Sequence, residues 1–492
     1  MFEAAEVGSA LDKATYKQEL PGLRSELLRV QRDIAASGLG PVVIVGGVEG
    51  VGKGEVMNTL LEWMDARGVE AHAFGDPTTE EQERPRYWRF WRVLPPRGKM
   101  AVLLGSWYTD PIVDRVFGRI DEVSYEREMR RIRDFERMLA FEGVPVIKFW
   151  LHVAKAEYEK RLRKARKDPE KQWRISKRTL KFAKRYDDFR PVSEEALRLT
   201  STGVAPWHIV EAQDERYRDY TVATTLVRGL REALEEAGAR RAGEEQQVVL
   251  PDPPTVNVIR QLDLTQQIPR KEYVRKRNRS QARLGRLVRE LHASEHSMIL
   301  VFEGPDAAGK GGTIRRLTAV MDARFYRVRS VSAPTDEEAA HPYLWRFWRD
   351  LPRRGHVTIY DRSWYGRVLV ERIEGFAARD DWQRAYAEIN EFEAQLGEAG
   401  TIVLKFWLAI SPEEQLRRFE DRETTPYKQY KLTREDWRNR KKWDAYEAAA
   451  CDMIERTSTD QAPWILVPAE DKRLARVEVL RAVSKRLSRE LT

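Results

Sequence analysis

The second half of the sequence carries a glycine-rich stretch whose residue types suit the binding of phosphate groups. Gly304, Gly309 and Lys310 fit the pattern G-x-x-x-x-G-K within "GPDAAGKGG", residues 304–312. The stretch follows an apolar run and precedes a segment with helical spacing, which is the context that this pattern requires. Glycines let backbone N–H groups surround a phosphate, a helix N-terminus adds a favourable dipole, and the lysine adds a positive charge. The sequence therefore predicts a phosphate-binding loop rather than a simple strand-to-helix turn.

The residues around this lysine differ from those of ordinary nucleoside triphosphatases. Gly311 and Gly312 stand where Ser or Thr usually supplies a hydroxyl to magnesium. Asp306 inside the loop and Asp361 at the end of a second apolar run, "HVTIYD", are acids that could hold a metal ion instead. Arg362 follows and could stabilise charge on a phosphoryl group during its transfer. An alternative for Asp361 is a helix cap ahead of "RSWYG".

Several sequence landmarks recur at a constant offset of 257 residues. Lys53 and Lys310 differ by 310 − 53 = 257, and the same offset relates both copies of "WRFWR", "SWY", "KFW" and "APW". Chance matches would scatter, so the chain is predicted to be a tandem duplication of one whole domain. The boundary lies in a stretch rich in charge, Gly and Pro, which predicts domains at 1–240 and 263–492 with a linker at 241–262.

The first copy lacks most of the side chains that could do chemistry. Subtracting 257 from Asp306, Asp361, Arg362 and Arg367 gives Glu49, Leu104, Gly105 and Asp110. Lys53 is retained, so the loop of the first copy could still bind phosphate. Because the acid at the strand end and the charge-stabilising arginine are both missing, we expect the first copy to be catalytically inactive.

Each copy alternates apolar runs with helical patterns. In the second copy "MILVFEG", "HVTIYD", "TIVLKFWLAI" and "APWILVPA" are typical of buried parallel strands. "SPEEQLRRFEDR" begins a helix with Ser as its cap and Pro in its first turn. This alternation predicts an α/β fold, with two tandem three-layer sandwiches built around parallel sheets. A stretch at 417–446 has 10 basic and 6 acidic residues, which is typical either of a helical lid over phosphates or of a solvated face.

The composition limits the number of domains and the classes of protein that fit the sequence. The chain has 492 residues, 42% of them hydrophobic, which is enough for two cores, and the net charge is 87 − 78 = +9. The single cysteine, Cys451, excludes an intrachain disulfide, argues against a thiolate zinc site and is expected to be a packing residue. No apolar run reaches the roughly 18 residues of a membrane span, and the first residues do not follow a secretory pattern. We therefore expect a cytoplasmic protein.

These elements together resemble the polyphosphate kinase 2 family. The resemblance rests on "FEGPDAAGKGG", "YDRSWYGRVLVERIEGF", "RFEDRETTPYKQYKLT" and "TSTDQAPWILVPAEDKRLAR", and it covers nearly all of the second copy and, more weakly, the first. It implies a P-loop kinase fold with helical lids, Mg²⁺, and a donor channel lined with Lys and Arg. The tandem arrangement resembles polyphosphate:AMP phosphotransferases, which implies inorganic polyphosphate and AMP or ADP as partners.

The resemblance also implies roles for individual residues. Asp306 and Asp361 fall at the metal, and Lys310, Arg362 and Arg422 on the phosphates. The wider phosphate-binding set is Gly304, Ala308, Gly309, Gly311, Gly312, Thr313, Arg367, Glu371, Arg372, Lys428 and Lys431. No nucleic-acid or membrane partner is expected, and homo-oligomerisation is left open.

Three other functions compete with this interpretation. A polyphosphate-dependent kinase of nucleoside diphosphates would use the same residues, and acceptor choice rests on analogy with the tandem architecture. An ATP-dependent nucleotide kinase is disfavoured by the missing Ser or Thr and by the basic lid. A polyanion-binding protein without catalysis is disfavoured by the paired acids, Asp306 and Asp361, because binding alone does not need them.

Overall fold

The computed structural model describes residues 1–169, 175–243, 257–426, 429 and 432–491. Lys428, Lys431 and most of the predicted linker lie outside the described residues. The chain forms two compact units. The first comprises Met1–Pro77, Tyr87–Gly243 and Pro334–Arg349, and the second comprises Thr78–Arg86, Glu244–Ala333 and Asp350–Thr492. The short segments from the other half of the sequence contribute no strand, so each sheet comes from one copy of the repeat.

The first copy of the repeat builds a parallel five-stranded sheet with the order β2-β3-β1-β4-β5. Its strands are β1 (Val42–Gly47), β2 (Val69–Ala73), β3 (Met100–Leu104), β4 (Val146–His152) and β5 (Trp207–Glu211). Its helices are η1 (Phe2–Ala5), α1 (Lys13–Ser37), α2 (Lys53–Trp63), α3 (Thr79–Gln82), α4 (Trp88–Trp91), α5 (Thr109–Val116), α6 (Glu122–Phe141), α7 (Lys155–Lys167), α8 (Lys177–Ala183), α9 (Tyr186–Thr200) and α10 (Glu215–Gly243).

The second copy repeats this topology with the order β7-β8-β6-β9-β10, again all parallel. Its strands are β6 (Ser297–Glu303), β7 (Tyr326–Ser330), β8 (Val357–Asp361), β9 (Thr401–Ala409) and β10 (Trp464–Pro468). Its helices are α11 (Arg270–His292), α12 (Lys310–Thr318), α13 (Asp336–Ala339), α14 (Trp345–Arg349), η3 (Trp364–Val368), α15 (Val370–Glu374), α16 (Arg379–Glu398), α17 (Pro412–Thr424), α18 (Arg434–Lys441), α19 (Trp443–Thr457) and α20 (Lys472–Glu490). The predicted α/β fold and its four predicted strands are confirmed.

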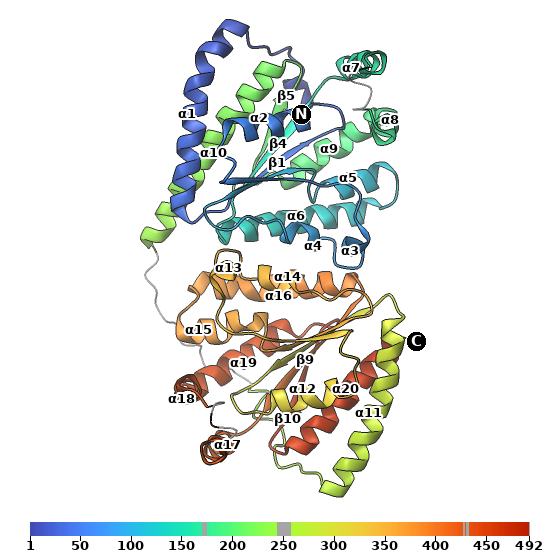
Figure 1. Ribbon diagram of the computed structural model, residues 1–492, viewed down its shortest axis with the longest axis vertical. Helices are drawn as coiled ribbons and strands as arrows, with labels where there is room; N and C mark the ends of the chain where they lie inside the picture. Colours follow the sequence, from blue (N-terminus) through green and yellow to red (C-terminus); the bar gives the residue numbers. More distant parts are fainter. Residues whose placement is uncertain (170–174, 244–256, 427–428, 430–431, 492) are drawn as a thin grey trace. The chain divides into compact units, whose positions relative to one another are not determined.

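The strands β6, β8 and β9 of the second copy are buried on both faces, as their continuous apolar runs require. Met298, Leu300 and Phe302 of β6 pack into one core with α11, α12 and α20. The strand β9 also packs against α16, and Figure 1 shows β9 between α16 and the α11–α12–α20 layer. Ser411 caps α17, as predicted: its side chain accepts a hydrogen bond from the backbone N–H of Glu414, and Pro412 follows in the first turn. The sheet is therefore the rigid layer from which the site residues project.

The "SWY" and "KFW" landmarks form a buried polar network in each copy. In the second copy Lys405 Nζ donates to Glu393 Oε2 at 2.7 Å, to Tyr365 Oη at 2.9 Å and to the Thr457 carbonyl at 2.6 Å. The first copy repeats the same contacts with Lys148, Glu136, Tyr108 and Thr200. Since both copies keep the network, it belongs to the fold rather than to the chemistry of one copy.

We expect Lys405→Met to destabilise the second unit by about 3–5 kcal/mol, because Glu393 would be left charged and unpaired in the core. Adding Glu393→Gln should recover part of this loss, since no uncompensated charge remains. Chemical denaturation followed by tryptophan fluorescence measures both values. A double variant that loses as much as the two single variants combined would contradict a coupled pair.

Candidate active site

The predicted phosphate loop connects the central strand β6 to α12. Gly304 and Gly309 have φ angles of 137° and 109°, which only glycine adopts easily. A Cβ added to Gly304 would lie 2.5 Å from the carbonyl oxygen of Leu408, so the backbone also needs glycine for space. Lys310 begins α12, and its Nζ donates to the Gly304 carbonyl at 2.7 Å. The loop therefore has the glycine-dependent backbone and the lysine of a phosphate cradle.

The loop opens into a cavity of about 880 Å³, called the phosphate cavity below. Its lining includes the predicted residues Asp306, Ala308, Gly309, Lys310, Gly311, Gly312, Asp361, Arg362 and Arg422. It also includes residues that the sequence analysis did not single out: Ala307, Arg315, Ser330, Val331, Arg418, Asp421, Asp436, Lys472 and Arg476. Seven of these 18 side chains are Lys or Arg and four are acidic, so the cavity carries an excess of positive charge suited to an anionic ligand.

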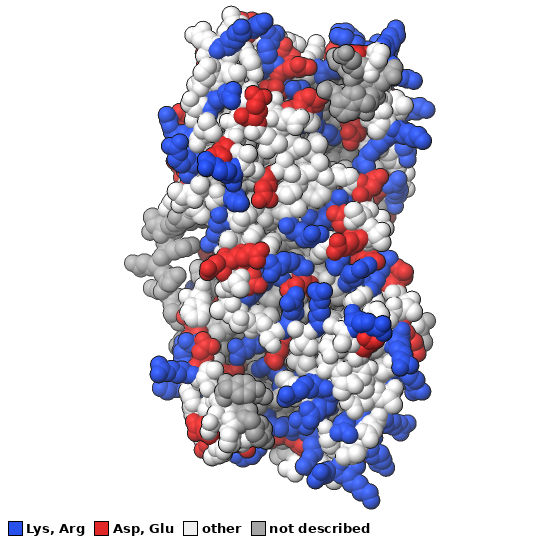
Figure 2. Space-filling view, in the orientation of Figure 1, with Lys and Arg blue, Asp and Glu red and all other residues white. Residues whose placement is uncertain are grey.

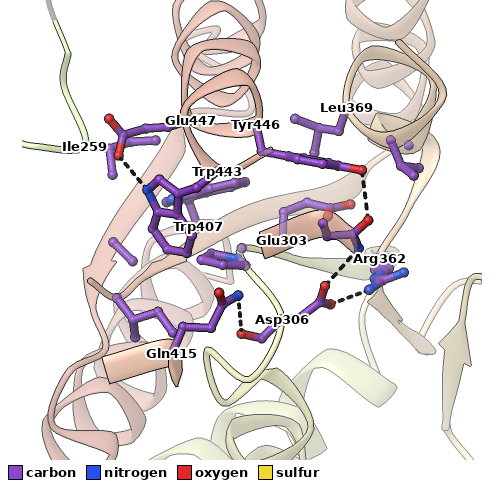
Figure 3. Close-up of a pocket in the computed structure, with 17 residues that line it drawn as sticks. Ile259, Glu303, Asp306, Arg362, Leu369, Trp407, Gln415, Trp443, Tyr446 and Glu447 are labelled. Carbon is purple, nitrogen blue, oxygen red and sulfur yellow. Dashed lines mark hydrogen bonds and ion pairs between the residues drawn. The ribbon is translucent and has the colours of Figure 1, made fainter. Parts of the chain in front are cut away.

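A smaller pocket of about 110 Å³ meets the phosphate cavity at Asp306 and Arg362, which line both. Figure 3 shows the rings of Trp407, Trp443 and Tyr446 in this pocket, which is called the aromatic pocket below. Its other lining residues are Ile259, Glu303, Gly304, Pro305, Gly366, Leu369, Val370, Ala409, Ile410, Gln415, Asn439 and Glu447. Aromatic faces combined with a few amide and carboxylate groups suit a planar heteroaromatic ligand with a charged end.

Asp306 lies at the junction of the two spaces. Its Oδ1 forms an ion pair with Arg362 Nη2 at 2.5 Å, and its Oδ2 accepts from Asn439 Nδ2 at 2.9 Å (Figure 3). Burial alone would raise the pKa of Asp306, but the charges of Arg362 and Lys310 and the hydrogen bonds outweigh burial and lower it. The carboxylate therefore stays ionised and brings a negative charge close to the phosphate loop.

Arg362 adopts a backbone conformation that non-glycine residues rarely populate. Its φ angle is 64°, and the equivalent residue of the first copy is Gly105, with a φ of 75°. A side chain in this region costs about 1–2 kcal/mol. The second copy thus keeps an arginine at a position where the first copy, with the same backbone, has glycine. Backbone strain of this kind is typical of functional sites, where it is retained because the side chain has a function.

Asp361 and Asp306 are the carboxylates that could hold a divalent metal ion. Asp361 ends β8 and lines the phosphate cavity with Asp306. Asp306 uses two of its roughly four lone-pair sites in the contacts above, so it can still accept a metal. In the described part of the chain no three acidic, His or Cys side chains gather as a metal site. A magnesium ion does not need three, since it is usually held by one or two carboxylates, waters and substrate phosphates.

Glu303 is a further acidic residue that the sequence analysis missed. It ends β6, is 4% exposed, and accepts from Ser363 Oγ at 2.9 Å. Burial raises its pKa, although the charges of Lys310 and Arg362 oppose this effect. The equivalent residue of the first copy is Gly46. The constant offset could have revealed Glu303, because it is another ionisable residue that the first copy lacks.

Four predicted residues do not line either space. Arg372 is buried, donates to Tyr386 Oη at 2.8 Å and forms an ion pair with Asp452 at 2.9 Å. Arg367 and Glu371 form an ion pair with each other at 2.9 Å. Thr313 is buried in α12 and donates to the Gly309 carbonyl. These four side chains therefore stabilise the neighbouring helices and the loop.

The first copy keeps the loop backbone but not the site. Gly47 and Gly52 have φ angles of 134° and 101°, close to those of their equivalents in the second copy. Lys53 is half-buried, with its Nζ 3.7 Å from Glu49 Oε1, and the guanidinium of Arg218 packs directly against Gly52. The loop of this copy is thus partly covered by the chain's own cation.

The space beside this loop is also altered. The pocket of the first copy is only about 60 Å³, and Phe182 and Phe189 line it where the second copy has Asn439 and Tyr446. Arg476 lines the phosphate cavity of the second copy, and the equivalent residue of the first copy is Asp219. A negative charge therefore replaces a positive one at this position. These replacements remove both the polar groups of the aromatic pocket and part of the positive charge.

The chain is similar to known proteins over nearly its whole length. The sequence model of the family described as polyphosphate kinase 2 (PPK2) matches residues 10–238 and again 267–491. The chain is 48% identical, over 98% of both sequences, to a polyphosphate:AMP phosphotransferase of Pseudomonas aeruginosa. It is 44% identical to one of Pseudomonas syringae pv. tomato over 99% of this chain and 98% of the relative.

A solved structure is similar over the whole chain. The crystal structure of a polyphosphate kinase 2, described as putative, from Pseudomonas aeruginosa PA01 has a TM-score of 0.89 and 47% identity, with 100% of this chain and 99% of that chain covered. The family's sequence model matches both copies of the repeat, and full-length relatives share nearly half of their residues with this chain. The chain therefore belongs to the polyphosphate kinase 2 family.

Proposed function

We propose that the second unit transfers a phosphoryl group from inorganic polyphosphate to AMP and releases ADP. The observation that carries this proposal is the junction of two unlike spaces at Asp306 and Arg362. The basic phosphate cavity suits a chain of phosphates, and the aromatic pocket suits a nucleotide base. The names of the full-length relatives, polyphosphate:AMP phosphotransferase, support the same donor and acceptor.

In the reaction an oxygen of the AMP phosphate attacks the terminal phosphorus of the donor. A new P–O bond forms, the P–O bond to the next phosphate of the donor breaks, and the electron pair stays on the shortened polyphosphate. The attacking oxygen is already ionised, so no general base is required. The protein's contribution is then to align the two phosphates and to neutralise their charge. The backbone amides of the loop and Lys310 would hold the donor, and Arg362 lies where the two substrates would meet.

We further propose that Asp306 and Asp361 hold Mg²⁺ during the reaction. Both carboxylates line the phosphate cavity and provide the hard oxygen ligands that this ion prefers. The bound ion would offset the repulsion between two anionic substrates. The Arg362 guanidinium, which pairs with Asp306 at 2.5 Å, would orient that carboxylate and compete with other ligands for its Oδ1.

We also propose that only the second unit is catalytic. The proposal is supported by the replacement of Glu303, Asp361 and Arg362 by Gly46, Leu104 and Gly105 in the first copy, and by Arg218 against its loop. The first unit then has a structural or accessory role within a chain whose predicted domains are 1–240 and 263–492. None of its helices, nor any other helix in the described part of the chain, has the length and apolar composition that crossing a membrane requires.

The proposed function is tested by incubating the purified full-length protein with Mg²⁺ and one donor–acceptor pair at a time. Polyphosphate with AMP should give ADP, measured by nucleotide chromatography. Polyphosphate with ADP tests the nucleoside-diphosphate alternative, and ATP with AMP tests an ordinary nucleotide kinase. Faster transfer from ATP than from polyphosphate, or faster use of ADP than of AMP, would overturn the proposed donor or acceptor. Tight polyphosphate binding without transfer to either acceptor would support a binding protein instead.

The phosphate cavity should lose affinity for its donor as the pH rises above neutrality. Burial, together with the neighbouring charge of Arg418, lowers the pKa of Lys472 to about 8. A lysine is neutral above its pKa, so the cavity loses a positive charge as the pH rises through about 8. We expect kcat/KM for polyphosphate to fall by up to about tenfold between pH 7 and 9, since this parameter reports the free enzyme. Lys472→Arg keeps its charge and should flatten the profile, and an unchanged profile in that variant would assign the fall to another group.

A further inference from the structure

A second basic cavity lies in the second unit, away from the site described above. Its volume is about 820 Å³, and it shares no lining residue with the phosphate cavity or the aromatic pocket. Its lining comes from α11, α20 and the edge strand β10. Six lining residues are Lys or Arg, namely Arg275, Lys276, Arg279, Arg283, Arg481 and Lys485. We call this cavity the basic groove.

The cations of the basic groove are arranged in rows. Arg275, Arg279 and Arg283 are four residues apart, so they lie on one face of α11 and extend over about 12 Å of its axis. Arg481 and Lys485 form a second row on α20, which packs along α11. Figure 2 shows that Lys and Arg side chains gather over α11 on the face in view. Two neighbouring rows of positive charge suit a linear polyanion better than a single small anion.

Few acidic side chains neutralise these cations. Arg481 Nη1 lies 3.3 Å from Glu478 Oε1, and Lys276 Nζ lies 2.5 Å from Glu272 Oε1. Within the described residues, Arg275, Arg279 and Lys485 form no ion pair, and all three are exposed. Their charges are therefore available to a ligand.

The first copy of the repeat shows that the fold does not require these cations. The residues at the positions of Arg275, Lys276, Arg279, Arg283, Arg481 and Lys485 are Gln18, Glu19, Gly22, Glu26, Thr224 and Arg228. The helices α1 and α10 nevertheless pack together as α11 and α20 do. Five of the six positive charges are thus specific to the second unit, which is the one with the complete site.

We propose that the basic groove is a second binding site for long polyphosphate, which holds the chain outside the active site between transfers. This inference rests on the proposed function, because it takes the donor of that reaction as its ligand. No aromatic side chain of the described residues lines the groove, whereas proteins that bind single-stranded nucleic acid use aromatic faces for base stacking. The lining therefore favours a phosphate chain without bases. The helix α20 lines both spaces, with Arg476 in the phosphate cavity and Arg481 in the basic groove, so a long chain held in the groove would raise the local concentration of its free end at the active site.

The test compares two triple variants of the full-length protein. Arg275→Gln/Arg279→Gln/Lys485→Gln removes three unpaired charges of the groove. Lys271→Gln/Arg286→Gln/Arg289→Gln removes the same charge from exposed positions of α11 that do not line it. We expect the groove variant to bind long-chain polyphosphate about tenfold more weakly without AMP, and its affinity to depend less steeply on salt. Its KM for AMP and its kcat/KM for short-chain polyphosphate should not change.

Each other outcome has a definite meaning. Equal effects of the two triple variants would overturn the proposal, because net charge alone would then explain them. Unchanged affinity for long polyphosphate, or equal losses for long and short chains, would also overturn it. A loss confined to single-stranded DNA would assign the groove to nucleic acid. If the unmodified protein transfers no phosphoryl group from either chain length, the proposed function fails instead, which the parallel activity assay distinguishes.

Discussion

Lys310→Ala should lower turnover by on the order of 10³-fold, whereas Lys53→Ala should leave it within about twofold of the unmodified protein. The two lysines are equivalent residues of the repeat, and each begins the helix after its loop. Lys310 lines the phosphate cavity with Asp306, Asp361 and Arg362. The environment of Lys53 is different, because Leu104 and Gly105 replace Asp361 and Arg362 in its copy and the guanidinium of Arg218 packs against Gly52 of its loop. Steady-state kinetics with polyphosphate and AMP measure the difference.

The comparison needs a control for folding, since both lysines donate to a carbonyl of their own loop. Thermal unfolding of the two variants shows whether each unit keeps its structure. Lys53→Met provides a second variant that keeps the apolar part of the side chain. Loss of turnover in a folded Lys53→Met protein would show that the first unit takes part in catalysis. Full turnover in Lys310→Ala would show that the lysine of the second unit's loop has no part in the proposed reaction.

Much of this site could be predicted because its residues follow directly from strand ends. Parallel strands bring their carboxyl ends to one edge of the sheet, so the loop after β6 and the acid that ends β8 had to lie close together. Asp306, Lys310, Asp361 and Arg362 are placed as the sequence analysis expected, in one cavity. The basic stretch at 417–446 also contributes to that cavity, through Arg418, Asp421, Arg422 and Asp436.

Other features needed the three-dimensional structure. The strand β7 was not predicted, because its residues are mostly exposed at the edge of the sheet and show no apolar run. Asn439 lies 133 residues after Asp306 and Tyr446 lies further along the chain, and only the packing of α18 and α19 brings them to the aromatic pocket. Arg372 fits the motif of the family, but its side chain points into helix packing and not into the cavity. Sequence spacing gives the element that holds a residue, but it does not give the direction of an irregular segment's side chains.

Arg362→Gly should reduce kcat by on the order of 10³-fold while leaving the fold intact. The φ angle of Arg362 is 64°, and Gly105 shows that the same repeat position accepts glycine at 75°. Replacement by glycine relieves about 1–2 kcal/mol of backbone strain but adds about 0.5–1 kcal/mol of chain entropy to the unfolded state. These backbone terms nearly cancel, so a fall in the free energy of unfolding would report the loss of the ion pair with Asp306, whose side chain is 10% exposed. The variant therefore separates the chemical role of the guanidinium from the stability of the turn.

Arg362→Lys is the matched control for this prediction, because it keeps a positive charge but loses the planar group that pairs with Asp306. If Arg362 acts by charge alone, the lysine variant should recover most of the turnover. If it also orients the Asp306 carboxylate, the lysine variant should stay well below the unmodified protein and should need a higher Mg²⁺ concentration. Rates, Mg²⁺ titrations and unfolding curves of both variants distinguish these cases. An Arg362→Gly protein with full turnover would show that the strained arginine has no part in transfer, and its backbone conformation would then have no functional explanation.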